Sequence, residues 1–178
     1  MNAFKRHLGE QFAELSPLIQ QAHIGTIRLE GDVFVRHGNP VARLLCRILN
    51  MPRQGESVKL VVDGYHESNS MRWNRCFDGH EMQSNFQEYG EFLIERLGPL
   101  KLWLKLSVDD NGSLHYLLKR VSLWGISIHR WLAPGLVASE SDQSGGYHFY
   151  VKITLPLVGK LIEYGGLISL RPDPDGAD

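Results

Sequence analysis

The chain has 178 residues, of which 43% are hydrophobic and 22% charged, and its formal net charge at pH 7 is −1. These proportions are those of an ordinary globular protein and exclude a disordered or fibrous chain. A chain of this length buries roughly two thirds of its surface in one core, so we expect a single domain over residues 1–178. The near-neutral charge argues against a nucleic-acid partner, which usually requires a basic surface.

Cysteine usage and the lack of long apolar runs indicate the compartment. Cys46 and Cys76 are too few for a disulfide framework and have no metal-ligand spacing, so we expect each to be a small buried hydrophobe. The N-terminus lacks the apolar core of a signal peptide, and no run approaches the roughly 20 apolar residues of a membrane span. We therefore expect a cytoplasmic protein with no membrane span.

The start of the chain has the pattern of short helices. An apolar stripe at helical spacing is formed by Phe4, Leu8, Phe12 and Leu15. Ser16 followed by Pro17 is typical of a helix cap and the first helical turn after it. We predict helical structure over about residues 3–22, followed by a strand over 24–36 in which Gly31 and Asp32 mark a bulge or a turn.

A second helical segment is inserted before the next strands. Asn39 and Pro40 give the cap signal, and the predicted helix runs over about residues 40–50. Its apolar face consists of Val41, Leu44, Leu45, Ile48 and Leu49, and its basic residues are Arg43, Arg47 and, just beyond, Arg53. A basic amphipathic helix can lie on a membrane surface, but a helix packed on a sheet shows the same pattern more often, so we expect packing.

Residues 56–170 have the pattern of a β-meander. The clearest strand is 100–108, where leucines alternate with Lys101, Trp103 and Lys105 and so form one apolar face. A turn at 109–112 leads to a return strand over 113–122, and Asp78-Gly79 predicts another tight turn. The remaining predicted strands are 58–65, 71–77, 80–89, 91–97, 136–141, 147–155 and 160–170. Residues 123–125 are predicted to break the strand pattern, 131–134 to form a connection, and 171–178 to be a frayed tail.

This order of elements predicts a mainly β fold of the α+β type. No long helical period separates the strands after residue 55, so the sheet should be antiparallel. About ten strands joined by short turns would curl, and closure removes exposed edges. We predict a meandering barrel or strongly curved sheet with N-terminal helices and one inserted helix. A barrel wider than about eight strands often encloses a cavity.

The strand pattern places several polar and aromatic residues on inward-facing positions. Trp73, Arg75 and Phe77 share a strand face, and an internal arginine needs a partner. The candidate ligand-binding residues are Trp73, Arg75, Phe77, Tyr116, Arg120 and Glu140. In one interpretation Arg75 or Arg120 receives the anionic head group of a ligand in an apolar cavity. In the other, arginine and glutamate form a structural pair inside the barrel, with Glu95 or Glu140 as partner.

Signals of catalysis are weak. Glu95 and Glu140 contain the groups of an acid/base pair, but nothing in the sequence fixes their separation. The chain has no G-x-S-x-G, H-E-x-x-H, Walker or dinucleotide-binding glycine pattern. His66-Glu67 and His80-Glu81 lack further ligands at metal-binding spacing. We therefore expect no catalytic residue, no metal and no cofactor, and lean against an enzyme.

Short motifs along almost the whole chain carry a family resemblance. They are the W-x-R-x-F element at 73–77 with Gly79 and Ser84, the segment 95–100, Leu132-Ala133-Pro134 with Glu140, Leu155-Pro156-Leu157 with Gly159 and Tyr164, and Phe12-Ala13-Glu14-Leu15. In these the chain resembles a bacterial family known only as a domain of unknown function, number 4166. The resemblance implies no established activity. It implies that relatives are sometimes attached to a dehydrogenase-like nicotinamide-binding domain, and hence an accessory or binding role beside a redox enzyme.

Three hypotheses of function remain open. The first is a small-molecule-binding barrel for an apolar or anionic amphipathic ligand, with a cavity that contains the candidate residues. The second is an accessory or oligomerisation domain, which forms a homodimer or binds a partner such as an oxidoreductase and has a filled barrel with an exposed apolar patch. The third is an isomerase or cyclase, in which Glu140 or Glu95 acts as a base of raised pKa and Arg75 as electrostatic stabiliser.

Overall fold

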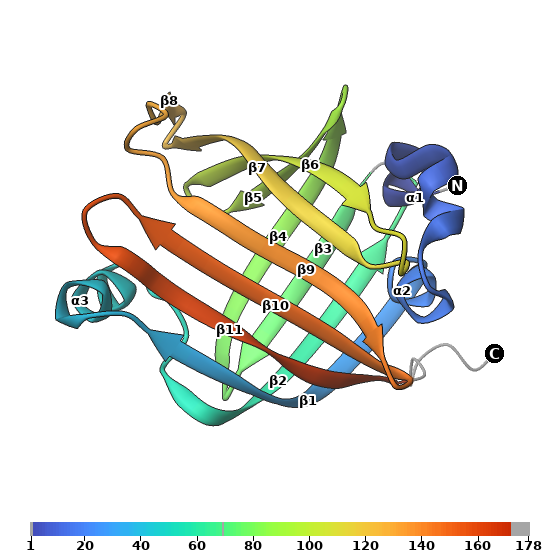
Figure 1. Cartoon of the computed structure of the whole chain (residues 1–178), viewed down its shortest axis with the longest axis horizontal. Coiled ribbons are helices and arrows are strands. Elements are labelled where there is room, and N and C mark those ends of the chain that lie inside the picture. The colour runs from blue at the N-terminus through green and yellow to red at the C-terminus, as the bar shows by residue number, and fades with distance from the viewer. Residues whose placement is uncertain (1, 69, 172–178) are drawn as a thin grey trace.

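The computed structural model describes residues 2–68 and 70–171. Its eleven strands form one antiparallel sheet, and pairing of β6 with β7 closes ten of them into a barrel (Figure 1). The strands are β1 Gly25–His37, β2 Gly55–His66, β3 Met71–Phe77, β4 His80–Tyr89, β5 Phe92–Leu97, β6 Leu100–Val108, β7 Leu114–Leu123, β8 Ile126–Ser127, β9 Gly135–Gln143, β10 Gly146–Leu155 and β11 Gly159–Arg171. The predicted antiparallel meander is confirmed, and β3, β4 and β6 have the predicted bounds.

The N-terminal helices close one end of the barrel. They are α1 Ala3–Leu8, the 3-10 helix η1 Gly9–Glu14 and α2 Pro17–Ala22, with Ser16 as N-cap of α2. Their large apolar side chains Phe4, Phe12, Leu15 and Ile19 are at most 3% exposed. The backbone N–H of Ser16 donates to the carbonyl of Gly112 in the β6–β7 turn, which fixes the helices to this end. The predicted helical N-terminus is thus confirmed, and its helices cover one end of the barrel (Figure 1).

The inserted helix α3, Pro40–Ile48, lies at the opposite end of the barrel (Figure 1). It contacts β11 through two small residues, Ala42 and Cys46, which are fully buried. Val41, Leu44 and Ile48 are exposed instead. The helix therefore packs on the sheet as expected, but mainly through another face: of the predicted apolar face Leu45 packs against the core, whereas Val41, Leu44 and Ile48 do not. The physical reason is that Ala42 and Cys46, four residues apart, form their own narrow face, which fits closely against β11.

Strand β1 has the predicted length of 13 residues, begins one residue later than predicted and is regular at Gly31 and Asp32. Gly31 and Asp32 pair regularly with Leu60 and Lys59 of β2, and the β-bulge lies later, between Val33 and Val35. Gly31 is needed for another reason. A Cβ atom there would lie 2.9 Å from the Ile168 side chain on the neighbouring β11, so glycine permits the close approach of these two strands.

Between the predicted break at 123–125 and the predicted connection at 131–134 lies one additional element, the two-residue strand β8. It pairs with the end of β7 after a turn at Trp124 and Gly125, both of which have positive φ angles. Two residues are too few to show a period of two, and the sequence pattern therefore missed this strand.

Candidate functional site

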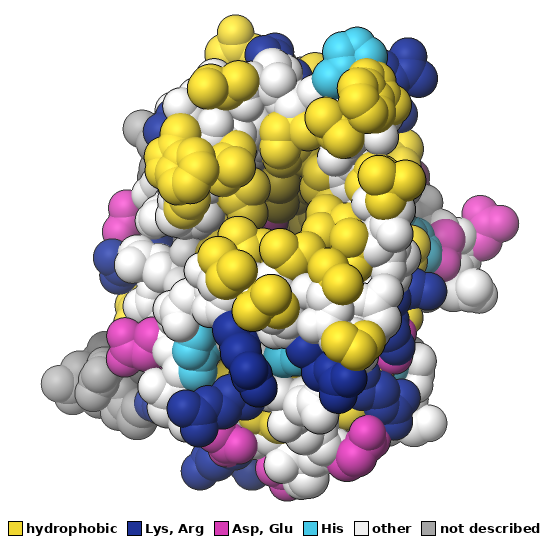
Figure 2. Space-filling view, turned by 90° about the vertical axis from the view of Figure 1, so that its left-hand side faces the viewer, with side chains coloured by type: hydrophobic (Ala, Val, Ile, Leu, Met, Phe, Trp, Pro, Cys, Tyr) yellow, Lys and Arg dark blue, Asp and Glu magenta, His cyan; other side chains and the backbone are white. Residues whose placement is uncertain are grey.

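A cavity of about 110 Å³, open to water-sized molecules, lies inside the barrel. It opens at the end opposite the N-terminal helices, and Figure 2 shows the opening surrounded by hydrophobic side chains. Most of its wall is apolar and includes Leu29, Leu60, Val62, Met82, Phe86, Leu102, Leu104, Leu136, Phe149, Val151 and Ile153. A closed ring of strands with inward-facing apolar side chains at alternate positions produces such an enclosure.

One cluster of polar side chains in the cavity wall is centred on Arg75 of β3. Its Nη1 donates to the Ser84 hydroxyl at 2.7 Å, and that hydroxyl donates to Glu95 Oε1 at 2.6 Å. The Arg75 Nη1 and Glu95 Oε1 atoms are 3.6 Å apart, and both side chains are less than 15% exposed. Although burial opposes it, the Glu95 carboxylate raises the pKa of Arg75 above its usual value, so Arg75 remains positively charged.

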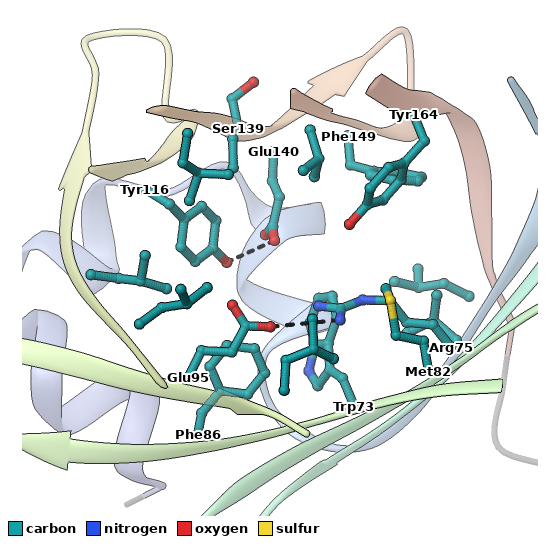
Figure 3. A pocket seen from close by; sticks show the side chains of 18 of the residues that line it. Trp73, Arg75, Met82, Phe86, Glu95, Tyr116, Ser139, Glu140, Phe149 and Tyr164 are labelled. Atoms are coloured by element: carbon teal, nitrogen blue, oxygen red, sulfur yellow. Dashed lines mark hydrogen bonds and ion pairs between the residues drawn. The ribbon is translucent and has the colours of Figure 1, made fainter. Parts of the chain in front are cut away.

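A second cluster of polar side chains is centred on Glu140 of β9. Its Oε1 accepts a hydrogen bond from the Tyr116 hydroxyl at 2.7 Å (Figure 3), and its Oε2 lies 2.7 Å from Nε2 of His23. Burial favours the neutral acid, but the nearby imidazole and the hydrogen bonds from His23 and Tyr116 outweigh it and lower the pKa of Glu140. Glu140 is therefore a buried carboxylate with defined partners.

An aromatic stack connects this carboxylate to the closed end. The His23 ring stacks between Phe4 and Trp73, with centroid distances of 3.9 and 5.4 Å. The Trp73 indole N–H donates to Nε2 of His66, whose Nδ1 lies 3.0 Å from the carbonyl oxygen of Gly25. Burial, together with His23, lowers the pKa of His66 to about 3, so this imidazole is neutral near pH 7.

Some polar atoms beside the cavity have unused hydrogen-bonding capacity. Within the described part of the chain, the buried Tyr147 hydroxyl has no partner at hydrogen-bond distance, although it lies near enough to Glu140 to help lower the pKa of that carboxyl. Of the donor atoms of the Arg75 guanidinium, Nη1 is the one that has an acceptor among the described residues. The Tyr164 hydroxyl points toward the same space (Figure 3). Buried polar groups are normally satisfied, so a polar atom of a bound molecule would complete this set.

The structure brings together four of the six candidate residues. Trp73, Arg75, Tyr116 and Glu140 all line the cavity. Phe77 is buried just behind the wall, where its ring meets Tyr164 edge to face at 5.5 Å.

Arg120 does not face the interior. A bulge shifts the β6–β7 register, so that Trp103 pairs with Arg120 whereas Leu104 pairs with Leu118. The extra residue reverses the alternation. Arg120 therefore lies outside, over the Trp103 ring and hydrogen-bonded to Ser127. The expectation that Tyr116 and Arg120 share a face is wrong for this reason.

Sequence reasoning did not identify His23, Ser84, Tyr147 and Tyr164 as part of the site. The last three occupy inward positions of predicted strands, where the alternation could have indicated them. His23 gave no such signal, because it lies between a helix and a strand and reaches Glu140 across 117 residues of sequence.

Glu140 does not have the raised pKa that the hypothesis of an isomerase or cyclase requires of it. A general base that works near neutral pH needs a raised carboxyl pKa, and the pKa of Glu140 is lowered. No cluster of three or more metal-ligating side chains occurs within residues 2–68 and 70–171. The cavity thus offers an apolar wall and two arrays of hydrogen-bonding groups.

Comparison with known proteins identifies a family. Residues 15–168 match the family model described as "Domain of unknown function (DUF4166)". No curated protein matches the chain. Across the part of the chain that the structure describes, no helix is long and apolar enough to span a membrane.

Proposed function

The chain belongs to the DUF4166 family of domains of unknown function, and we propose that it binds one small, mainly apolar molecule inside its barrel. The observation that carries the proposal is the cavity itself, which is open at one end, closed at the other and lined by both apolar walls and convergent polar groups. Ligand sites of proteins combine these features. The cavity volume of about 110 Å³ restricts the ligand to a small molecule.

The polar groups favour a ligand with an uncharged polar end. Arg75 is already paired with Glu95, and Glu140 adds a second carboxylate to the same cavity. An anionic head group would have to approach both carboxylates in surroundings of low polarity, which is costly. A carbonyl or hydroxyl group, in contrast, accepts from the free donors of Arg75 without bringing a new charge.

In this proposal the candidate residues have distinct roles. Trp73 contributes apolar area, whereas Arg75 and Tyr116 orient the polar end of the ligand. Glu140 positions Tyr116 through their hydrogen bond. Phe77 supports Tyr164 from behind, and Arg120 has no part in ligand binding because it lies outside.

The first test is native mass spectrometry of protein purified gently from its own host, compared with its denatured mass. We expect an additional mass that is lost on denaturation. The second test is titration with phenylnaphthylamine, an uncharged apolar fluorophore, and with anilinonaphthalene sulfonate, its anionic analogue. We expect saturable binding of the uncharged probe at one site per chain. A bare mass together with no saturable binding of either probe would overturn the proposal.

A matched variant tests the head-group argument. Glu95→Gln removes one negative charge but keeps an acceptor for Ser84. Because Arg75 then lacks a counter-charge, affinity for the sulfonate should rise about tenfold, the value of one charge-assisted hydrogen bond. Affinity for the uncharged probe should stay the same. If the wild-type protein already prefers the sulfonate, the natural ligand is anionic and the uncharged head group is wrong.

A further inference from the structure

Large apolar side chains are exposed around the mouth of the barrel. They belong to three connections at this end, 38–54 between β1 and β2, 124–134 between β7 and β9, and 156–158 between β10 and β11, which we call the rim. The exposed large apolar residues of the rim are Val41, Leu44, Ile48, Leu49, Trp124, Ile126, Trp131, Leu132 and Leu157. Leu157 is fully exposed, and Trp124 is 77% exposed. Figure 2 shows these apolar surfaces as a ring around the opening rather than as scattered spots.

The large apolar side chains of α3 are exposed because of the way in which the helix packs on β11. Asn39 caps the helix and also donates to the carbonyl of Val158, while Cys46 donates to that of Leu161. These contacts hold one side of α3 on the start of β11. They direct Leu44 and Ile48 outward, to the side of the helix that has no partner within the described residues. The helix is therefore an amphipathic element whose large apolar side chains meet solvent.

The rim is also positively charged. Its basic residues are Arg43, Arg47, Arg53 and Arg130, and none of its three connections contains Asp or Glu. Arg120 adds a charge beside β8 through its hydrogen bond to Ser127. The whole chain nevertheless has a net charge of −1, so positive charge is concentrated here. Figure 2 shows Lys and Arg side chains gathered along one side of the apolar ring.

We propose that the rim docks on the surface of an anionic phospholipid bilayer, with its apolar side chains in the interface and its arginines on the lipid phosphates. Exposed leucine, isoleucine and tryptophan beside arginine is the composition of interfacial membrane-binding segments. Anionic lipids attract such basic residues. A second copy of the chain fits less well, because a twofold interface through the rim would bring its arginines against each other.

Docking would place the mouth of the cavity against the bilayer. An apolar ligand could then pass between lipid and barrel without crossing water, which is the step that limits a poorly soluble molecule. This consequence rests on the proposed function, whereas docking itself does not.

The test is co-sedimentation of the full chain with vesicles of phosphatidylcholine alone or mixed with phosphatidylglycerol. We expect binding to the mixed vesicles and little binding to phosphatidylcholine alone. Replacing Arg43 and Arg47 by Gln should weaken binding roughly thirtyfold, from about fivefold for each charge. Ile48→Asn with Leu157→Asn should weaken binding to the mixed vesicles at least tenfold, because apolar contact is lost.

Matched controls separate docking from general charge and from ligand binding. Lys5→Gln with Arg72→Gln removes two exposed charges near the closed end and should leave vesicle binding within twofold of wild type. Ala138→Phe, which fills the cavity, should abolish probe binding but leave vesicle binding intact. Equal binding to both vesicle types, or equal loss in the rim variants and in the Lys5/Arg72 control, would overturn the proposal. So would a concentration-dependent dimer that the Ile48/Leu157 variant dissociates.

Discussion

The two ends of the barrel use helices in opposite ways. At the closed end, α1, η1 and α2 bury Phe4, Phe12 and Ile19 and become part of the core. At the open end, α3 is held by the small residues Ala42 and Cys46 and presents Leu44 and Ile48 to solvent. Both segments have amphipathic patterns. The difference teaches that the size of the residues at the contact decides whether an apolar stripe becomes core or surface.

The largest expected difference in the free energy of unfolding comes from replacing one large apolar side chain at each end of the barrel by alanine. Phe4→Ala should lower the free energy of unfolding by about 3–5 kcal/mol, because it leaves a cavity beside His23. Ile48→Ala should change it by less than about 0.5 kcal/mol, because Ile48 is 69% exposed. Urea unfolding followed by circular dichroism measures both. Similar losses in the two variants would mean that α3 is as much part of the core as α1.

Acid should weaken the closed end in particular. The pKa of His66 is about 3 in the folded chain and 6.5 when unfolded, so the unfolded chain binds a proton that the folded chain does not. The contribution of neutral His66 to the free energy of unfolding is therefore fully present above about pH 6.5. It falls by about 1.4 kcal/mol per pH unit as the pH drops below that value. Between pH 6.5 and 5 we expect a loss of about 2 kcal/mol, measured by urea unfolding at each pH.

Substitution of His66 tests the origin of this pH dependence. His66→Gln should remove most of the slope of the free energy of unfolding with pH. Burial also lowers the pKa of His7, so His7 adds a decrease of the free energy of unfolding toward acid pH. This smaller decrease should remain in the His66→Gln variant. The lowered pKa of Glu140 acts in the same sense, but only below its unfolded value of 4.5. A slope unaffected by His66→Gln would contradict the assignment.

A smaller difference, in affinity for a ligand probe, is expected between substitutions on the two faces of β9. Ala138 and Val137 are neighbours on β9, with Ala138 in the cavity wall and Val137 on the outside. Ala138→Phe should reduce affinity for phenylnaphthylamine at least tenfold because its ring occupies the ligand space. Val137→Phe should leave affinity within twofold. Fluorescence titration measures both variants, and equal losses would show that the probe binds elsewhere.

Alternation predicted the strands well because each face of a barrel strand meets one environment. The period of two over residues 71–77 placed Trp73 and Arg75 inside, and the structure has them there. The sequence did not predict the fate of Arg120, since one bulge residue reverses every later position of β7. Nor did it predict the contact of His23 with Glu140, which exists only after the barrel closes.

The orientation of α3 could not be read from its pattern either. The same stripe of Val41, Leu44 and Ile48 is compatible with burial and with exposure. What decides is the tight fit of Ala42 and Cys46 on β11, together with Gly38, where a Cβ would collide with the Lys160 carbonyl. These are contacts between segments more than one hundred residues apart in the sequence.

The meander order of the strands has a consequence for folding. Nearly every strand pairs with its neighbour in the chain, so most of the sheet can form by adding one hairpin after another, with small loss of chain entropy. Two pairings are exceptions: β7 pairs with β9 past the two-residue β8, and β1 pairs with β11, which joins residues such as Leu29 and Leu170 from opposite ends of the sequence. We expect the pairing of β1 with β11 to form last and to limit the folding rate. Because α3 follows β1 and donates to the Leu161 carbonyl on β11, it adds contacts across that junction, and the enclosed interior forms only once β1 and β11 have paired.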